Sequence, residues 1–191
     1  MSLAEVYFGI STRKKLNLHL KKETMKNEVI EPAVASSTDT ALSHQDLVQQ
    51  WQGHRRLTRR VIEAFPEKEL FTFSVAGMRP FAQLAKEMLG MAMPGLEGVV
   101  TRKWGKYADD AAITTKAELL AKWDETTAYI DDNWPKIPAG RFNEDDVAFG
   151  QWPGKVYWMM MYFIDNEIHH RGQGYVYLRA LGIEPPHFWE R

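Results

Sequence analysis

The sequence of 191 residues contains no cysteine. Without cysteine the chain has no disulfide bond, no thiolate ligand for a metal ion and no cysteine nucleophile. Any metal site must therefore be built from histidine, carboxylate or amide side chains.

Long hydrophobic runs are also absent. No apolar run approaches the roughly 18–20 residues that span a bilayer. The first residues lack the apolar stretch and the cleavage site of a secretory signal. We therefore expect a cytoplasmic protein with no membrane partner.

Neither sign of charge dominates, because the chain has 24 Lys and Arg residues and 25 Asp and Glu residues, which gives a formal net charge of −1. This balance gives no electrostatic footprint for nucleic acid, so we expect no nucleic-acid partner. The sequence also lacks the Gly-rich loops of nucleotide-binding folds and the G-x-S-x-G elbow of serine hydrolases.

Apolar residues make up 45% of the chain and aromatic residues 12%, which is enough for one packed domain. Helical periodicity appears in four segments, residues 43–64, 79–95, 115–133 and 155–180. The sequence therefore predicts an all-α four-helix bundle over residues 43–191, with a long loop over residues 134–154 and an N-terminal arm over residues 1–42. Residues 96–107 are a candidate extension of the second helix, and Phe71–Phe73 is a candidate short strand without an evident partner.

Capping residues predict several of the helix ends. Ser43 with Asp46, and Thr115 with Glu118, have the spacing of N-terminal capping boxes. Pro94 followed by glycine predicts the end of the second helix.

The helix expected over residues 155–180 carries two polar residues inside an apolar stripe. Residues three and four apart share a helix face, so Asn166 and His170 lie in line with Met159 and Phe163. A buried polar group costs on the order of 1–3 kcal/mol unless it is paired, so both residues need a partner inside the bundle. The simpler interpretation is a core histidine bonded to a neighbouring side chain, and the alternative is a metal ligand.

Two further residues flank this stripe. His169 lies one turn from Asp165, and the simpler interpretation is an orienting or surface pair between them, with a metal ligand as the alternative. Glu167 and His170 have the Glu-x-x-His spacing of di-iron carboxylate bundles. That architecture needs a second such motif, which the sequence lacks, so we do not expect a di-iron site.

The first and second helices each carry one candidate ligand. His54 interrupts the apolar face of the first helix, and Glu87 lies at the edge of the apolar face of the second. If the two helices are antiparallel neighbours, both side chains lie at about the same depth at 1.5 Å rise per residue, and His170 can join them. The simpler interpretation of His54 is that it lies at the edge of the core beside Arg55. The simpler interpretation of Glu87 is that it is exposed to solvent beside Lys86.

A set of histidine and carboxylate ligands suits Zn, Ni, Mn or Fe(II) rather than a soft metal. Three protein ligands with open positions are typical of a reactive metal ion rather than a closed structural one. The sequence therefore predicts one divalent metal ion in the bundle core and a small-molecule substrate.

The run IHHRGQGYVYLRALGIEPP, residues 168–186, resembles the final helix of the DinB/YfiT-like superfamily. The pattern there is His-x-x-His-His-Arg-Gly-Gln, then a turn rich in Tyr and Leu, Gly and Pro. Arg79 and the apolar segment after it are similar to the second helix of that superfamily. The resemblance covers residues 43–191 and implies a bacterial protein with the same four-helix bundle.

The resemblance also implies a metal site. Members generally bind a divalent metal ion through one histidine of the second helix and a His-x-x-x-His pair of the last. In this sequence the first position falls on Glu87 and the pair falls on Asn166 and His170, so only His170 matches. Glu87 is a sound ligand for a hard metal and Asn166 a weak one, which leaves His54 or Glu167 to complete the set.

The activities that the resemblance implies are those of thiol-dependent S-transferases, which use low-molecular-weight thiols, and of metal-dependent isomerases or hydrolases. The metal ion would acidify a thiol or a water, and the resulting nucleophile would attack a small electrophilic molecule. His54 would be a third ligand or a general base, Asn166 would orient the nucleophile, and His169 would support the ligands.

The competing hypothesis is a non-enzymatic, stress-related interaction module with a degenerate metal site. Ile164, Ile168 and Tyr175 form a second apolar strip on the last helix, which predicts a homodimer interface. Dimerisation is compatible with both hypotheses.

Overall fold

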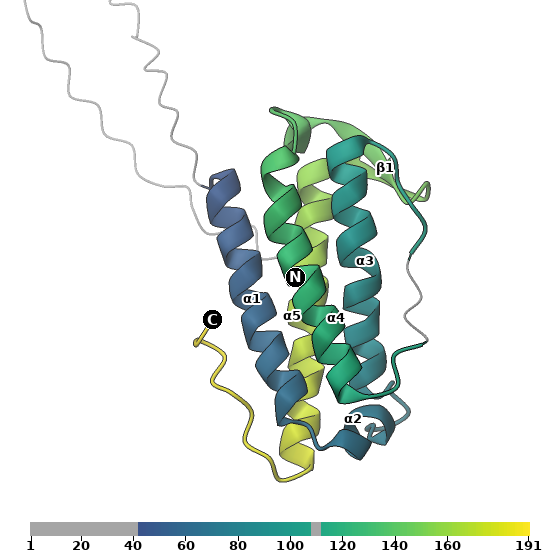
Figure 1. The fold of residues 1–191 in the computed structure, drawn as a ribbon, viewed down its shortest axis with the longest axis vertical. Coiled ribbons are helices and arrows are strands. Elements are labelled where there is room, and N and C mark those ends of the chain that lie inside the picture. Colours follow the sequence, from purple (N-terminus) through teal and green to yellow (C-terminus); the bar gives the residue numbers. More distant parts are fainter. Residues whose placement is uncertain (1–41, 108–111) are drawn as a thin grey trace, which may run out of the picture. The chain divides into compact units, whose positions relative to one another are not determined.

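The computed structural model describes residues 42–107 and 112–191. Four long helices form a bundle, as Figure 1 shows: α1 (His44–Ala64), α3 (Phe81–Thr101), α4 (Lys116–Asn133) and α5 (Val156–Ala180). The predicted four-helix bundle is therefore confirmed. The predicted arm over residues 1–42 lies outside the described residues except for Leu42.

Shorter elements connect the long helices. They are α2 (Glu67–Thr72), the 3-10 helices η1 (Trp134–Lys136) and η2 (Arg141–Asn143), and the strands β1 (Asp145–Ala148) and β2 (Trp152–Lys155). The candidate strand over Phe71–Phe73 is wrong, because Phe71 and Thr72 belong to α2 and Phe73 caps its C-terminus. None of the described helices is long and apolar enough to cross a membrane.

The arrangement of the helices decides which residues can meet. α1 packs against α4 and α5, and α3 also packs against α4 and α5. α1 and α3 therefore lie on a diagonal of the bundle, so the condition under which His54 and Glu87 could meet, that their helices are neighbours, is not fulfilled. α1 and α5 run in one direction and α3 and α4 in the other (Figure 1).

The predicted capping boxes are confirmed. Ser43 accepts a hydrogen bond from the backbone N–H of Asp46, whose carboxylate accepts one from the backbone N–H of Ser43. Thr115 and Glu118 make the same reciprocal pair at the start of α4. Each pair satisfies donors that the first helical turn leaves without a partner, which fixes where the helix begins.

The second helix does not end at Pro94. α3 continues through this residue to Thr101 and ends at Arg102, which has a left-handed backbone conformation. Pro94 removes one helical N–H donor, but Leu96 and Val99 continue the buried face beyond it. Burial of that face outweighs the local signal of the proline, so the candidate extension over residues 96–107 is correct as far as Thr101 and wrong beyond it.

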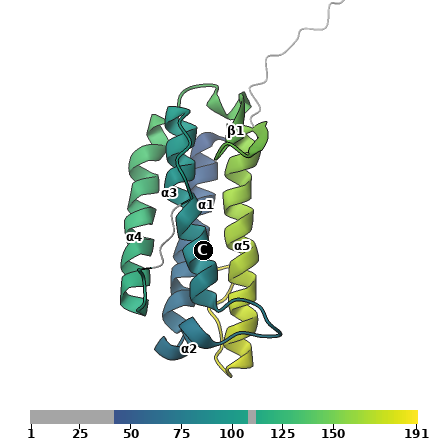
Figure 2. The ribbon, with the colours of Figure 1, turned by 90° about the vertical axis from the view of Figure 1, so that its right-hand side faces the viewer.

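The long loop before α5 contains a hairpin that the sequence did not predict. β1 and β2 pair in antiparallel register from Asp145 opposite Lys155 to Ala148 opposite Trp152. Arg141, 1% exposed, holds the loop to the bundle by donating to the carbonyl of Val99 at 2.8 Å. Figures 1 and 2 show the hairpin at the end of the bundle where α5 begins.

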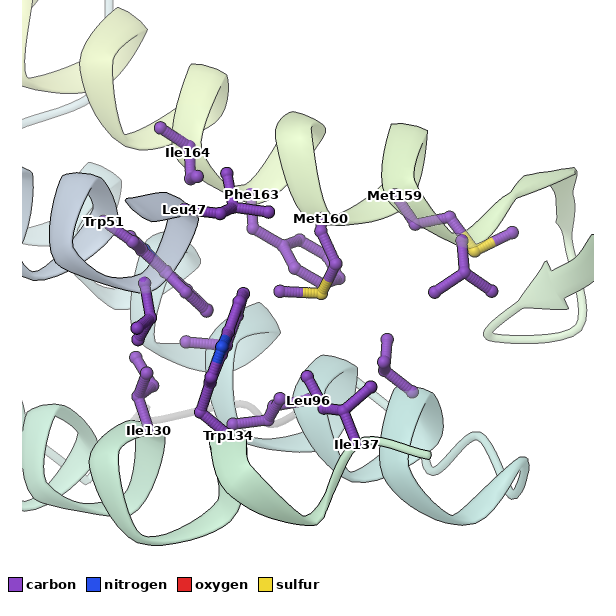
Figure 3. Packing of buried hydrophobic residues seen from close by; sticks show 14 of the residues in the cluster. Leu47, Trp51, Leu96, Ile130, Trp134, Ile137, Met159, Met160, Phe163 and Ile164 are labelled. Carbon is purple, nitrogen blue, oxygen red and sulfur yellow. The ribbon is translucent and has the colours of Figure 1, made fainter. Parts of the chain in front are cut away.

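The core consists of two apolar clusters. The cluster at the hairpin end is built around Trp51, Met160 and Phe163, and Figure 3 shows Trp51 and Phe163 facing the same interior. The cluster at the other end includes Phe81, Trp123 and other apolar residues. In α1, α4 and α5 the buried polar residues lie between the stretches that belong to these two clusters, so these helices form a polar layer between the apolar halves of the bundle. In α3 the half-buried Glu87 lies among residues of the second cluster, such as Leu84 and Met88. The polar layer contains His54, Asn166, Glu167 and His170.

Candidate functional site between α3 and α5

A cluster of four polar side chains joins α3, and the residues just before it in the chain, to α5. Nε2 of His170 lies 2.9 Å from Oε1 of Glu87, and Nδ2 of Asn166 donates to the same oxygen at 3.2 Å. Arg79 binds the other oxygen of Glu87, with 2.5 Å between Nη1 and Oε2. We call Arg79, Glu87, Asn166 and His170 the α3–α5 cluster.

Glu87 is the centre of this cluster, and its side chain is 23% exposed. Burial alone would raise the pKa of its carboxyl group, but the hydrogen bonds from His170, Arg79 and Asn166 lower the pKa below its ordinary value. Glu87 is therefore a carboxylate at neutral pH, and the proton in its contact with His170 belongs to Nε2 of the imidazole.

Asn166 is less completely satisfied. Its side chain is buried, and its Oδ1 atom has no hydrogen-bond partner among the described residues. A buried acceptor without a partner costs on the order of 1–3 kcal/mol. The α3–α5 cluster thus contains one oxygen that no described group of the protein satisfies.

His169 lies on the exposed side of His170. Its Nε2 atom is 3.0 Å from Nε2 of Gln173, whose Oε1 atom is 3.5 Å from Nδ1 of His170. The expected pairing of His169 with Asp165 is replaced by this contact with Gln173. Gln173 was not singled out in the sequence, although its spacing of three and four residues from the two histidines was a usable signal.

Glu167 points to another side of α5, toward α1. Its carboxylate accepts from Oγ1 of Thr58 at 2.7 Å and from Nε1 of Trp51 at 3.3 Å, and it lies 3.8 Å from Nη1 of Arg55. Burial raises the pKa of Glu167, and the neighbouring cations and donors oppose that effect. Glu167 is therefore the carboxylate of a buried ion-pair network and not a partner of Glu87.

His54 belongs to the same network. Its Nδ1 atom lies 3.0 Å from Nη2 of Arg171, and its Nε2 atom lies 3.3 Å from Nη1 of Arg191. Burial, with the positive charges of both arginines, lowers the pKa of His54 from 6.5 to about 4. We call the set that joins α1 to this side of α5 the α1–α5 network: Trp51, His54, Arg55, Thr58, Glu167 and Arg171.

The structure therefore divides the predicted site residues between two sides of α5. It brings Glu87, Asn166 and His170 together and places His54 and Glu167 elsewhere. The depths expected for His54 and Glu87 along the bundle are not enough to make them meet, because α1 and α3 are on a diagonal. At about 100° per residue, Glu167 and Arg171 are each about 100° around the axis of α5 from Asn166 and His170 respectively, which directs them toward α1.

A cavity of about 300 Å³ lies one helical turn from the α3–α5 cluster. Met91, Tyr162 and Phe163 line the cavity. Met91 is four residues after Glu87 in α3, and Tyr162 and Phe163 are four and three residues before Asn166 in α5, which is about one turn in each helix. Aromatic residues of the hairpin region, including Trp152, complete its wall. An apolar cavity beside a few convergent polar groups is the usual form of a small-molecule site.

The donor set of the α3–α5 cluster fits one divalent metal ion. It offers a carboxylate, an imidazole and the unpaired amide oxygen of Asn166, which suit a hard or borderline metal. Among residues 42–107 and 112–191, no group of three or more His, Asp or Glu side chains is placed to hold a metal ion. The third donor here is an amide, so these residues fit a site with two strong ligands and one weak ligand.

Comparison with solved structures places the fold among DinB-like helical bundles. A DinB-like protein from Bacillus cereus is similar with a TM-score of 0.59 and 17% identity over 76% of this chain and 97% of that chain. A DinB-like protein from Bacillus subtilis is similar with a TM-score of 0.56 and 15% identity over 76% and 99% of the two chains. At these identities the likeness concerns the fold.

The family model of the DinB family matches residues 36–191. The chain therefore belongs to the DinB family, as the run near its C-terminus predicted. No curated protein matches the sequence.

Proposed function

We propose that the protein binds one divalent metal ion, Zn, Ni, Mn or Fe, at the α3–α5 cluster and acts on a small electrophilic molecule as a thiol-dependent S-transferase or a hydrolase. The observation that carries this proposal is the convergence of Glu87, His170 and the unpaired Oδ1 atom of Asn166 beside an aromatic cavity. Membership of the DinB family supports the same reaction class.

Glu87 and His170 are the two main ligands in this proposal, and Asn166 is the third donor or orients the nucleophile. A bound metal ion supplies a Lewis acid that lowers the pKa of a coordinated thiol or water. Gln173 contacts His170 at Nδ1 and keeps its Nε2 atom directed toward Glu87. Arg79 holds Oε2 of Glu87, which leaves Oε1 as the oxygen facing His170. His169 supports the ligands from outside through Gln173.

The cavity lined by Met91, Phe163 and Trp152 favours an apolar or aromatic electrophile. The α3–α5 cluster, one helical turn from this cavity, would supply the nucleophile. In this account His54 and Glu167 are structural residues of the α1–α5 network and take no part in the reaction.

A metal-free interaction module is the second candidate. It is favoured by the way Arg79, His170 and Asn166 already satisfy the two oxygens of Glu87. A carboxylate that is paired by one ion pair and two hydrogen bonds needs no metal ion to balance its charge. In that case Glu87 and His170 would stabilise the contact between α3 and α5 and would have no chemistry of their own.

The proposed activity is tested with the protein loaded in turn with Zn, Ni, Mn and Fe(II). Two reactions are followed, the conjugation of free cysteine to 1-chloro-2,4-dinitrobenzene and the hydrolysis of 4-nitrophenyl acetate. We expect a metal-dependent rate in one of them that falls to the uncatalysed rate in His170→Ala, while His54→Ala keeps most of it. A rate that survives in His170→Ala, or no rate with any of the four ions, would contradict the proposal.

A further inference from the structure

A second cavity, of about 410 Å³, lies between the C-terminal half of α5 and residues 184–189. Figure 1 shows the segment after α5 running back alongside α1, where Glu190 pairs with Arg60 at 3.1 Å. Ile168, Tyr175 and Arg179 line the α5 side of the cavity. These positions lie on the face of α5 opposite Asn166 and His170, so the cavity is separate from the α3–α5 cluster.

Gly172 lies on the α5 wall of this cavity. A Cβ atom at Gly95 or Gly174 would lie 2.5 Å from an aromatic ring, of Phe163 and of Phe81 respectively, so those two glycines allow close packing. A Cβ atom at Gly172 would meet nothing within 4 Å, so no described neighbour requires glycine there. A large side chain at this exposed position would take up space on the cavity wall.

The polar groups of the cavity favour an anion. Arg171 and Arg179 line it, against the single carboxylate of Glu184. Arg171 donates to neutral acceptors, namely the hydroxyl of Thr58 at 3.2 Å and the carbonyl and ring nitrogen of His54. The hydroxyl group of Tyr175, on the same wall, is buried and has no hydrogen-bond partner among the described residues.

The charge balance of the buried residues behind this wall also favours an anion. The α1–α5 network holds two guanidinium groups, Arg55 and Arg171, against the one carboxylate of Glu167. The low pKa of His54 keeps its imidazole neutral, so it adds no charge at neutral pH. Burying an unbalanced cation is costly, and an anion beside Arg171 would offset that cost.

The remaining walls are apolar and planar. Pro185, Pro186, Phe188 and Trp189 line the cavity, and the last two side chains are 67% and 64% exposed. The ring of Trp189 stacks on that of His187, with 4.6 Å between centroids and 6° between planes. Exposed aromatic side chains at the mouth of a cavity are suited to contact with a flat ligand.

We propose that this cavity binds a small aromatic carboxylate. The carboxylate group would be held by the guanidinium groups of Arg171 and Arg179 and by the hydroxyl of Tyr175, and the ring would pack against Trp189 and the two prolines. The charge-assisted hydrogen bonds select the anion, and the planar walls select an aromatic body. The proposal does not depend on the activity proposed for the α3–α5 cluster.

The experiment measures binding of 2-naphthoate to the full chain by isothermal titration calorimetry, beside neutral 2-naphthamide and inorganic phosphate. We expect saturable 1:1 binding of 2-naphthoate, with each of the other two probes at least about tenfold weaker. Equal affinity for 2-naphthamide would overturn the role of the charge, and equal affinity for phosphate would overturn the role of the ring. The absence of saturable 2-naphthoate binding up to about 5 mM would overturn the whole proposal.

Four variants locate the binding site. Gly172→Leu fills the cavity and should weaken binding more than about tenfold, while Gly172→Ala, which adds one methyl group in open space, should fold at least as stably as wild type. Arg179→Gln should weaken binding about five- to tenfold, whereas Arg102→Gln removes the same charge from an exposed pair with Glu144 and should leave binding unchanged. If Gly172→Leu does not fold, the difference in binding between Arg179→Gln and Arg102→Gln shows whether the ligand binds in this cavity. Equal binding by these two arginine variants would place the ligand elsewhere.

Discussion

The two polar clusters on different sides of α5 differ in burial and in how fully their carboxylates are paired. In the α1–α5 network, Arg55 and Glu167 are 1% and 2% exposed, and Glu167 accepts from two donors besides its ion pair. In the α3–α5 cluster, Glu87 is 23% exposed and Asn166 keeps an unpaired oxygen. The buried and fully paired Glu167 stabilises the fold, whereas an accessible carboxylate beside a spare amide oxygen is suited to bind a metal ion. Similar residue types on one helix thus serve different purposes because their surroundings differ.

The largest expected effect is on stability, in the α1–α5 network. Glu167→Ala leaves Arg55 and Arg171 buried without their carboxylate and should lower the free energy of unfolding by about 3–5 kcal/mol. Glu167→Gln keeps an acceptor for the hydroxyl of Thr58 and should lose less. Urea denaturation followed by circular dichroism measures both changes. A loss below about 1 kcal/mol in Glu167→Ala would show that the network is not structural.

The next effect is a dependence of stability on pH that comes from His54. Its pKa is about 4 in the folded protein against an ordinary value of 6.5, so the unfolded chain takes up a proton first as the pH falls. The contribution of His54 is therefore complete above pH 6.5 and is lost progressively toward pH 4. The difference in melting temperature between pH 7 and pH 5 should be smaller in His54→Gln than in wild type. An unchanged difference would mean that His54 is not held neutral.

The smallest effect on stability is expected at Glu87. Glu87→Gln retains an oxygen for Asn166 and His170, and the ion pair with Arg79 is partly exposed, so the variant should lose less than about 1 kcal/mol. The same urea measurement as for Glu167 allows a direct comparison. If Glu87→Gln costs as much as Glu167→Ala, the contrast between the two clusters fails and the metal-free module becomes the better account.

Local signals in the sequence predicted most of the fold. The capping pairs Ser43–Asp46 and Thr115–Glu118 set two helix starts, and both are confirmed because a cap depends only on neighbours in the chain. The continuation of α3 past Pro94 depends on burial of the face beyond it, which a local rule does not include. The hairpin was missed because each strand has only four residues and β2 contains a proline and a glycine.

The site was predicted less completely than the fold. Glu87, Asn166 and His170 were identified from their positions on or beside apolar helix faces and again from the family pattern, and the structure places them in contact. His54 was added from its depth along the bundle, but depth does not tell which helices are neighbours or which way a side chain points around the axis. Arg79 as a partner of Glu87 depends on the turn before α3, whose course the sequence did not reveal.

We expect the α3–α5 cluster, and not the α1–α5 network, to bind a metal ion. Elemental analysis of the purified, untagged protein beside His170→Ala and His54→Ala, which remove one imidazole from each cluster, tests this expectation. We expect about one Zn, Ni, Mn or Fe per chain in the wild type and in His54→Ala, and none in His170→Ala. No metal in any of the three proteins, even after ions are added, or metal lost only in His54→Ala, would contradict it.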